Sequence, residues 1–189
     1  MPDIKIIDAI FTKKIVGSID VWVPQSPDLC GNLEFYKERQ VAGDEVWHYT
    51  CCGPGGTWAN RFLENPLIHM RIQHWMNYRF GTTGYLHWGL NAWHHCTLGQ
   101  ACPDSRNWPP GDCFIIYPAE EKVYSSIRFE AMRDGIHDYE LLKLLDRKDP
   151  EKAQQLAVSV VHSGNNYDTN IRTFRVTRKK LLTWLSDRK

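Results

Sequence analysis

The first half of the chain alternates β-rich runs with helix-like segments, and this alternation constrains the fold more than any other feature. Strands are expected at residues 4–11, 15–23, 45–53 and 82–90, with helices at 33–43 and 65–81 between them. Such alternation is typical of parallel strands joined by right-handed crossovers, with helices covering at least one face of the sheet. The sequence therefore predicts an α/β fold with about four parallel strands.

The expected helix at 65–81 carries the clearest local signals. Asn65 is a residue type that caps free N–H groups, Pro66 suits the first turn, and Gly81 tolerates the conformation that ends a helix. Apolar residues recur on one face of this segment and predict its contribution to the core: Ile68, Ile72, Trp75 and Met76.

From residue 125 onward the pattern becomes helical. One helix is expected at 125–145 after a Ser cap, a second from Asp149-Pro150 to near Gly164, and a third from a cap at Asp168 to the C-terminus. We therefore expect a single domain in two parts. Residues 1–124 supply the strands, their helices and a long loop at 91–112, and residues 125–189 form helices that pack on them.

Charge and composition exclude several classes of partner. Lys and Arg number 23 against 22 Asp and Glu, a net charge of +1, so no overall positive field attracts nucleic acid or an anionic membrane. Basic residues near the C-terminus (Arg172, Arg175, Arg178, Lys179) are expected to form a solvated helix face. No run approaches the ~18 apolar residues of a membrane span, and no signal peptide opens the chain. As written we expect a soluble, cytoplasmic protein, or an exported one if an upstream segment carries a signal.

The six cysteines do not form a regular framework, so no general disulfide scaffold is predicted, although a Cys96–Cys102 bridge remains an alternative. A zinc site is an alternative for the residues His94, His95, Cys96 and Cys102, with Cys51 and Cys52 on a neighbouring strand. Adjacent ligands do not easily converge on one ion, so no metal and no cofactor are predicted.

Aromatic residues gather where the expected strands end. Seven of the eight Trp lie between Trp22 and Trp108. In parallel α/β folds, the carboxyl ends of the strands build the site. The candidate binding residues at those ends are Trp22, Tyr49, Trp88, Asn91 and Trp93. Flat rings with a polar rim suit a pyranose sugar, and the alternative is that the rings are core.

No pair of carboxylates stands out as a general acid and its partner. Asp44 and Glu45 are adjacent, but they precede their strand, on the side of the sheet that this architecture reserves for stability. Asp20 lies inside an expected strand, where it either hydrogen-bonds in the core or reaches the site.

Several segments resemble a known family. "GSIDVWVPQ", "GDEVWHYTCCGP", "PLIHMRIQHWMNYRFGTTGYLHWGLNAWHH", "GDCFIIYP" and "SIRFEAMRDGIHDYELLKLL" are similar to the C-terminal half of the glycoside hydrolase family 123 catalytic domain, from about residue 3 to 146. The most specific part runs from Arg128 through Glu130, Arg133 and Asp134 to Gly135, followed by Asp138, Tyr139 and Glu140.

The resemblance implies the C-terminal half of a (β/α)8 TIM-like barrel followed by a helical C-terminal segment. It also implies a retaining β-N-acetylgalactosaminidase with substrate assistance. In that chemistry the acetamide oxygen of the sugar attacks the anomeric carbon, one acid protonates the leaving oxygen, and a neighbouring carboxylate steadies the acetamide. The adjacent Asp-Glu pair of the family would precede residue 1, so we expect this chain alone to be inactive. The alternative is a non-catalytic carbohydrate-binding or partner-binding domain.

On this interpretation Trp88 and Trp93 face a glycan, Asn91 hydrogen-bonds it, and Tyr49 and Trp22 form neighbouring walls. A supporting structural role is expected for the remaining candidates: Asp20, Arg128, Glu130, Arg133 and Asp134. Glu130 and Arg133 are three residues apart on a helix and can pair. The open edges of a half-barrel call for a partner, either a second copy in a homodimer or an N-terminal half-barrel.

Overall fold

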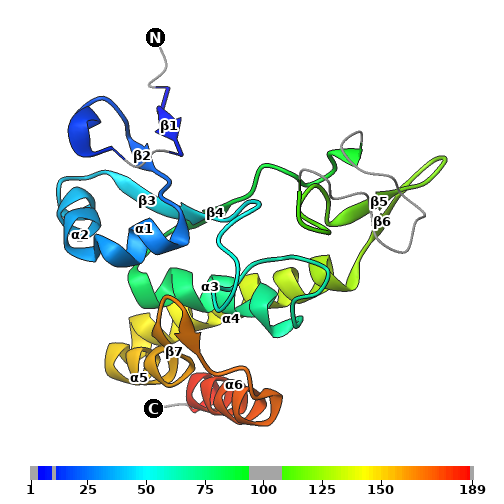
Figure 1. Cartoon of the computed structure of the whole chain (residues 1–189). Helices are drawn as coiled ribbons and strands as arrows, with labels where there is room; N and C mark the ends of the chain where they lie inside the picture. Colours follow the sequence, from blue (N-terminus) through cyan, green and yellow to red (C-terminus); the bar gives the residue numbers. More distant parts are fainter. Residues whose placement is uncertain (1–3, 10–11, 94–107, 188–189) are drawn as a thin grey trace.

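The structure, a computed structural model, describes residues 4–9, 12–93 and 108–187. Four parallel strands form one sheet in the order β1-β2-β3-β4, with helices beside it and a helical C-terminal part (Figure 1). The first half of the chain contains β1 (Ile7–Asp8), the 3-10 turn η1 (Lys13–Ile15), β2 (Val21–Trp22), α1 (Ser26–Gly31), α2 (Leu33–Val41), β3 (Glu45–Tyr49), α3 (Ile68–Phe80) and β4 (Gly84–Leu86). The second contains β5 (Ile116–Pro118), β6 (Val123–Ser125), α4 (Ile127–Lys148), α5 (Pro150–Val160), β7 (Val161–Ser163), β8 (Asn166–Tyr167) and α6 (Ile171–Ser186).

The parallel sheet confirms the arrangement predicted from the alternating pattern, but its first two strands are much shorter than expected. Val21 pairs with Ile7 on one side and with Glu45 on the other. The expected strands at 4–11 and 15–23 are reduced to two residues each, because η1 lies between them and Gly17 turns the chain at a φ of 83°. The β-rich composition of residues 15–19 therefore does not reflect strand pairing, which begins at Asp20 with backbone hydrogen bonds to Ile6 and Glu45.

Side chains on the two faces of the sheet meet different surroundings. Trp22 and Val46 are register neighbours, and both are buried with Leu29 and Tyr36 of the helices α1 and α2. Because successive strand residues point to opposite faces, Tyr49 points away from these helices. The helices α1, α2 and α3 lie on one side of the sheet (Figure 1), and Tyr49 therefore faces the other side.

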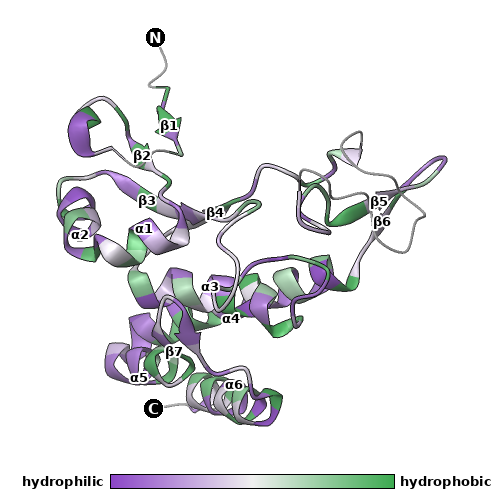
Figure 2. Ribbon diagram, viewed as in Figure 1, coloured by the Kyte–Doolittle hydropathy of each residue, from purple (hydrophilic) through white to green (hydrophobic). Residues whose placement is uncertain are grey.

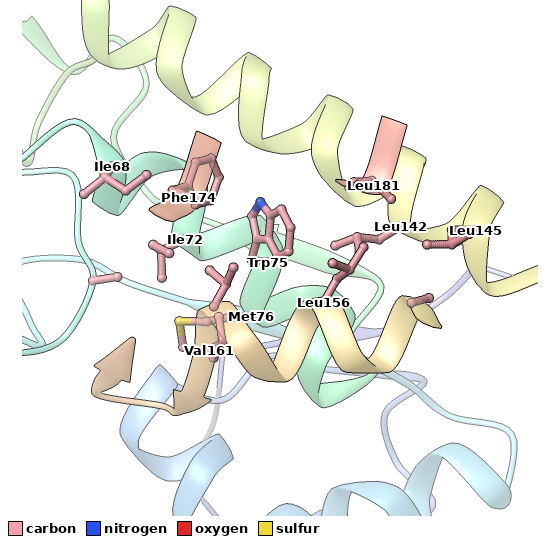
Figure 3. Close-up of a cluster of buried hydrophobic side chains, with 13 residues drawn as sticks. Ile68, Ile72, Trp75, Met76, Leu142, Leu145, Leu156, Val161, Phe174 and Leu181 are labelled. Carbon is pink, nitrogen blue, oxygen red and sulfur yellow. The ribbon is translucent and has the colours of Figure 1, made fainter. Parts of the chain in front are cut away.

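The main core lies around α3, and it confirms the predicted apolar stripe. Ile68, Ile72, Trp75 and Met76 are all buried, and the side chains that enclose them come from α4, α5 and α6 (Figure 3). Helices α5 and α6 each carry both hydrophobic and hydrophilic residues (Figure 2), as expected of helices that bury one face and solvate the other. The partners on those helices include Leu142, Leu156, Phe174 and Leu181.

The helix ends confirm some predicted signals and correct others. Gly81 ends α3 in the left-handed conformation with a φ of 73°, and Ser126 and Asp149 cap α4 and α5 through their side chains. The predicted Asn65 cap is wrong, because α3 begins later, after Leu67, with no side-chain cap. Asp168 does not cap the last helix: the side chain of Asn170 accepts from the first N–H groups of α6. The segment before it forms the β7–β8 hairpin.

One buried carboxylate joins three of these helices. Asp138 of α4 is fully buried, and its Oδ2 accepts from Arg71 Nη2 at 2.6 Å and from Trp75 Nε1 at 3.1 Å, both on α3. Its Oδ1 accepts from Arg178 Nε of α6 at 2.8 Å. A buried charge needs such partners, since its desolvation is otherwise uncompensated. Asp138 thus fixes the packing of α3, α4 and α6.

We expect Asp138→Asn to lower the free energy of unfolding by about 3 kcal/mol, because it removes the charge that two arginines and an indole share. Chemical denaturation measures this loss. Glu140→Gln is the matched control, since it makes the same change at an exposed position of α4 and should move the midpoint little. Equal midpoints for the two variants would show that the buried Asp138 carboxylate contributes no more to the free energy of unfolding than an exposed carboxylate does.

Candidate active site

The candidate site lies after β4, where the aromatic segment 88–93 runs along residues 112–116. Three hydrogen bonds hold the two segments together. The N–H of Ala92 donates to Cys113 O at 3.0 Å and that of Ile115 donates to Leu90 O at 3.0 Å, and these two bonds make an antiparallel bridge between Asn91 and Phe114. Trp93 donates from Nε1 to Ile116 O at 2.8 Å. The backbone of 112–116 therefore positions the residues that the sequence marked as sugar-facing.

Trp88 is the most exposed of the predicted site tryptophans. The residue is 38% exposed, and its Nε1 donates to Asp112 Oδ2 at 2.9 Å. The ring of Trp108 lies 5.0 Å away at an angle of 45°, and the His87 ring stacks on Trp88 with a centroid separation of 6.4 Å and an angle of 21°. The indole is held at its nitrogen edge, so its position is fixed while part of the ring remains accessible.

His87 and Asp112 are polar residues with buried side chains that contact the Trp88 ring. His87 Nδ1 accepts from the N–H of Gly89 at 3.1 Å, so the proton of a neutral ring lies on Nε2. That atom is 3.1 Å from Asp112 Oδ1. The contact is close but poorly directed, because neither atom completes a hydrogen bond. Burial lowers the pKa of His87 to about 4, more than the neighbouring Asp112 raises it. His87 is therefore neutral near pH 7.

Two buried arginines hold the segment that carries Asp112. Arg61 Nη2 donates to the carbonyl of Asp112 at 2.8 Å. Arg128, the first arginine of α4, donates to the carbonyls of Arg61 at 2.6 Å, Gly111 at 2.9 Å and Phe114 at 2.7 Å. Burial lowers the pKa of Arg61 to about 10, so it stays charged at neutral pH. Arg128 thus fastens the start of α4 to the aromatic segment through backbone carbonyls.

Tyr49 lies at the carboxyl end of the neighbouring strand. It pairs with Leu86 in the sheet register, and its N–H donates to Pro24 O at 3.0 Å. Its side chain is half-buried, and this burial raises the pKa of its hydroxyl. Tyr49 therefore occupies the edge of the sheet that leads to Trp88.

Two predicted site residues lie elsewhere. Trp22 is 1% exposed, packs edge-on against Phe35 and Tyr36, and donates from Nε1 to Asp44 Oδ2 at 2.9 Å. Its ring faces the helices, on the opposite side of the sheet from Tyr49. Asp20 accepts from the N–H of Ile6 at 2.7 Å and so ties β1 to β2. The structure does not bring either residue to the ring of Trp88.

The remaining predicted residues of α4 form ion pairs on its outer side. Arg133 pairs with Glu130 and lies 3.7 Å from Asp134. Asp134 also lies 3.9 Å from Arg71 of α3. These partly exposed pairs contribute little individually to stability. Two of these pairs lie within α4 and one joins α4 to α3, and none contacts the aromatic segment.

The adjacent acids Asp44 and Glu45 lie at the amino end of β3. Asp44 accepts from Trp22 and lies 3.8 Å from Arg39, while Glu45 pairs with Lys5 and accepts from Trp47. Both carboxylates therefore support structure at the edge opposite to the aromatic segment. Within the described residues no group of three or more His, Cys, Asp or Glu is placed to hold a metal ion. The residues weighed for zinc at positions 94–96 and 102 lie outside those described.

Sequence reasoning missed the buried polar side chains that support the aromatic segment. Asp112 and the buried His87 and Arg61 are not among the residues that the sequence predicts for the site. The signal that could have found them is the turn Pro109–Asp112, which directs "GDCFII" back along the aromatic stretch.

These observations define a mixed α/β chain with a four-stranded parallel sheet and an aromatic segment at the carboxyl edge. The family model described as "Glycoside hydrolase 123, catalytic domain" matches residues 1–145. This chain therefore belongs to the glycoside hydrolase family 123 catalytic domain family, as its motifs predicted, and it is a glycoside hydrolase-like chain.

Among solved structures, the chain is similar to a family 123 glycoside hydrolase from Clostridium perfringens, whose report concerns the details of glycolipid glycan hydrolysis. The TM-score is 0.68 at 21% sequence identity, and the match covers 96% of this chain and 34% of that chain. At this identity the likeness supports the fold, and the chain spans about a third of the length of that enzyme. The comparison with curated proteins found no match. Of the helices described, none is long and apolar enough to cross a membrane.

Three buried histidines are expected to make the fold sensitive to acid. Burial lowers the pKa of His48 and of His87 to about 4 and that of His74 to about 3, from an ordinary value of 6.5. Above pH 6.5 these rings are neutral in both the folded and the unfolded chain. As the pH falls from 6.5 towards 4, only the unfolded chain takes up their protons, so stability falls by up to about 1.4 kcal/mol per pH unit for each histidine.

Urea denaturation at a series of pH values measures this loss. His74→Gln should reduce the slope between pH 6 and pH 5 by roughly one proton, since Gln does not titrate. His137→Gln, at an exposed position of α4, should leave the slope unchanged. A free energy of unfolding that is flat across this range in the unmodified chain would show that the histidines titrate normally.

Proposed function

We propose that this chain is the C-terminal half of a (β/α)8 barrel and supplies the glycan-holding wall of a retaining, substrate-assisted β-N-acetylgalactosaminidase. The proposal rests on the family match over residues 1–145 and on the aromatic segment after β4. Parallel barrels of this kind place their sites at the carboxyl ends of the strands, where Tyr49 and Trp88 lie. The adjacent Asp-Glu pair of the family would come from a part of the barrel outside this stretch.

The single observation that carries the proposal is the geometry of Trp88. Sugars stack their apolar faces on aromatic rings, and a site of this type needs a ring that is accessible and does not rotate. Trp88 meets both needs, because Asp112 accepts from its Nε1 at 2.9 Å while 38% of the residue stays exposed. The exposed Asn91, three residues on, supplies an amide that can hydrogen-bond a hydroxyl or an acetamide.

Trp93 is a second aromatic residue of the proposed glycan-holding wall. Its indole nitrogen is occupied by Ile116 O, so it offers a glycan its ring and not its N–H. The buried Trp22 takes no part in the proposed wall, although its sequence position suggested that it would.

We expect Trp88→Ala to weaken binding of N-acetylgalactosamine or its methyl β-glycoside at least tenfold, because the stacking surface is removed. Trp88→Phe should lose less, since it keeps a ring and gives up only the bond to Asp112. Isothermal titration calorimetry measures both. Trp184→Phe, on α6 and distant in sequence from the segment, is the matched control for loss of an indole. The proposal fails if the unmodified chain binds no N-acetylhexosamine, or if Trp88→Ala binds as well as the control.

Hydrolysis separates the enzyme from the alternative, a non-catalytic carbohydrate-binding domain. Asp44 and Glu45 are committed to structural contacts at the amino edge, so this chain alone should bind the sugar and release no chromophore from an aryl β-N-acetylgalactosaminide. Turnover by the chain alone would show that it contains its own acids. Binding that persists without turnover after an N-terminal half-barrel is supplied would favour the alternative.

A partner for the sheet edge is also proposed. In the described residues β1 pairs on one side only, with β2, and Ile4 and Ile6 beside it are 80% and 54% exposed. Unpaired edges with apolar side chains favour association. We expect a second copy to cover this edge when the chain is studied alone, and light scattering should report a dimer. A monomer across the micromolar range would contradict the dimer and leave the N-terminal half-barrel as the proposed partner.

A further inference from the structure

Two adjacent cysteines follow β3 directly, at the same carboxyl edge as Tyr49. The sulfurs of Cys51 and Cys52 lie 3.8 Å apart, and both cysteines are free. Cys52 is exposed, whereas Cys51 is half-buried. The other described cysteines are shielded from solvent to different degrees: Cys113 is buried, and Cys30 packs against Gly164, so closely that a Cβ at that glycine would lie 2.2 Å from its sulfur.

Hydrogen bonds to both its backbone and its sulfur position Cys51. The N–H of Cys51 donates to Gly53 O at 2.7 Å, and the carbonyl of Cys51 accepts from Asn60 Nδ2 at 3.0 Å. The sulfur of Cys51 also accepts from Gln25 Nε2 at 3.4 Å. These contacts fix Cys51 while the sulfur of the exposed Cys52 can be reached from solvent. The arrangement provides one accessible thiol beside one positioned thiol.

We propose that Cys51 and Cys52 are a redox modification site, which closes reversibly to a disulfide between adjacent residues on reaction with a low-molecular-weight disulfide. The thiolate of Cys52 attacks one sulfur of the small disulfide, forms a mixed disulfide and expels one small thiolate. The thiolate of Cys51 then attacks the sulfur of Cys52 and expels the second. Two protein thiols are oxidised, one small disulfide is reduced to two thiols, and the two protons released pass to the solvent or the expelled thiolates.

Ring strain makes this modification reversible. Consecutive Cα atoms across a trans peptide are about 3.8 Å apart, below the usual range of about 4.4–6.8 Å for disulfide-bonded cysteines. A disulfide formed under such strain is more easily reduced, which is the property of labile and regulatory disulfides. Burial, followed by the neighbouring Cys51, raises the pKa of Cys52, so its reaction accelerates roughly tenfold per pH unit while the pH remains below that pKa. The pair is thus slow to oxidise at neutral pH and easily restored.

The test treats the chain with excess oxidised glutathione at pH 8.5 and maps peptides by mass spectrometry without reduction. We expect the peptide that contains both residues to lose two hydrogen atoms and to carry no glutathione, and dithiothreitol to reverse the change. Cys51→Ser should instead retain one glutathione on Cys52, because it lacks the second thiol. Cys30→Ser is the control variant and should behave as the unmodified chain does. These measurements do not depend on glycan binding.

Two results would overturn the proposal. One is a stable glutathione adduct on Cys52 in the unmodified chain, which would show that the two sulfurs do not close. The other is a bond from either residue to a different cysteine.

Phenylarsine oxide gives a second measurement that needs no variant. Its arsenic forms two bonds to sulfur with loss of one water, so one equivalent should block both thiols together. Blocking of a single thiol would contradict the closeness of the pair.

Discussion

The carboxylate of Asp138 is the interaction on which the other parts of the structure depend, because a buried charge cannot be left unpaired. It accepts from Arg71 and Trp75 of α3 and from Arg178 of α6, so three helices must meet at one point of α4. The apolar core around Trp75 and Phe174 lies beside this point. Burial of those rings stabilises the fold by removing apolar surface from water, and the hydrogen bonds of the carboxylate are satisfied only when the three helices pack in this way.

The same helix sets the position of the candidate site. Arg128 lies at the start of α4, and its hydrogen bonds to three carbonyls fix the loop that carries Asp112. Asp112 in turn holds the indole of Trp88. Because Asp138 fixes the packing of α4, Arg128 at the start of α4 and Asp112 in the adjoining loop together determine the position of the Trp88 ring. The segment of α4 with the most specific resemblance to the family thus supports the aromatic segment through Arg128, although its ion pairs do not contact that segment.

Patterns that depend on local physics were predictable from the sequence. The apolar stripe of α3, the glycine that ends it and the parallel order of the strands follow from periodicity and residue type, and the structure shows all three. Features that depend on tertiary contacts were not predictable. Trp22 ends a strand as a sugar-facing residue would, yet strand alternation turns it to the helices. His87 and Asp112 are 25 positions apart and become partners only because residues 112–116 return along the aromatic segment.

The acidic groups at both ends of the sheet are committed to structural contacts. Asp44 and Glu45 are bound to Trp22, Trp47 and Lys5 at the amino edge. At the carboxyl edge Asp112 is fully buried, with one oxygen bonded to Trp88 and the other facing His87, so it cannot reach a glycosidic oxygen. The neutral His87 is buried as well and has no path to a substrate proton. The described acid and histidine nearest to Trp88 therefore hold the ring, and the proposed function requires that the acid that protonates a leaving group come from another element.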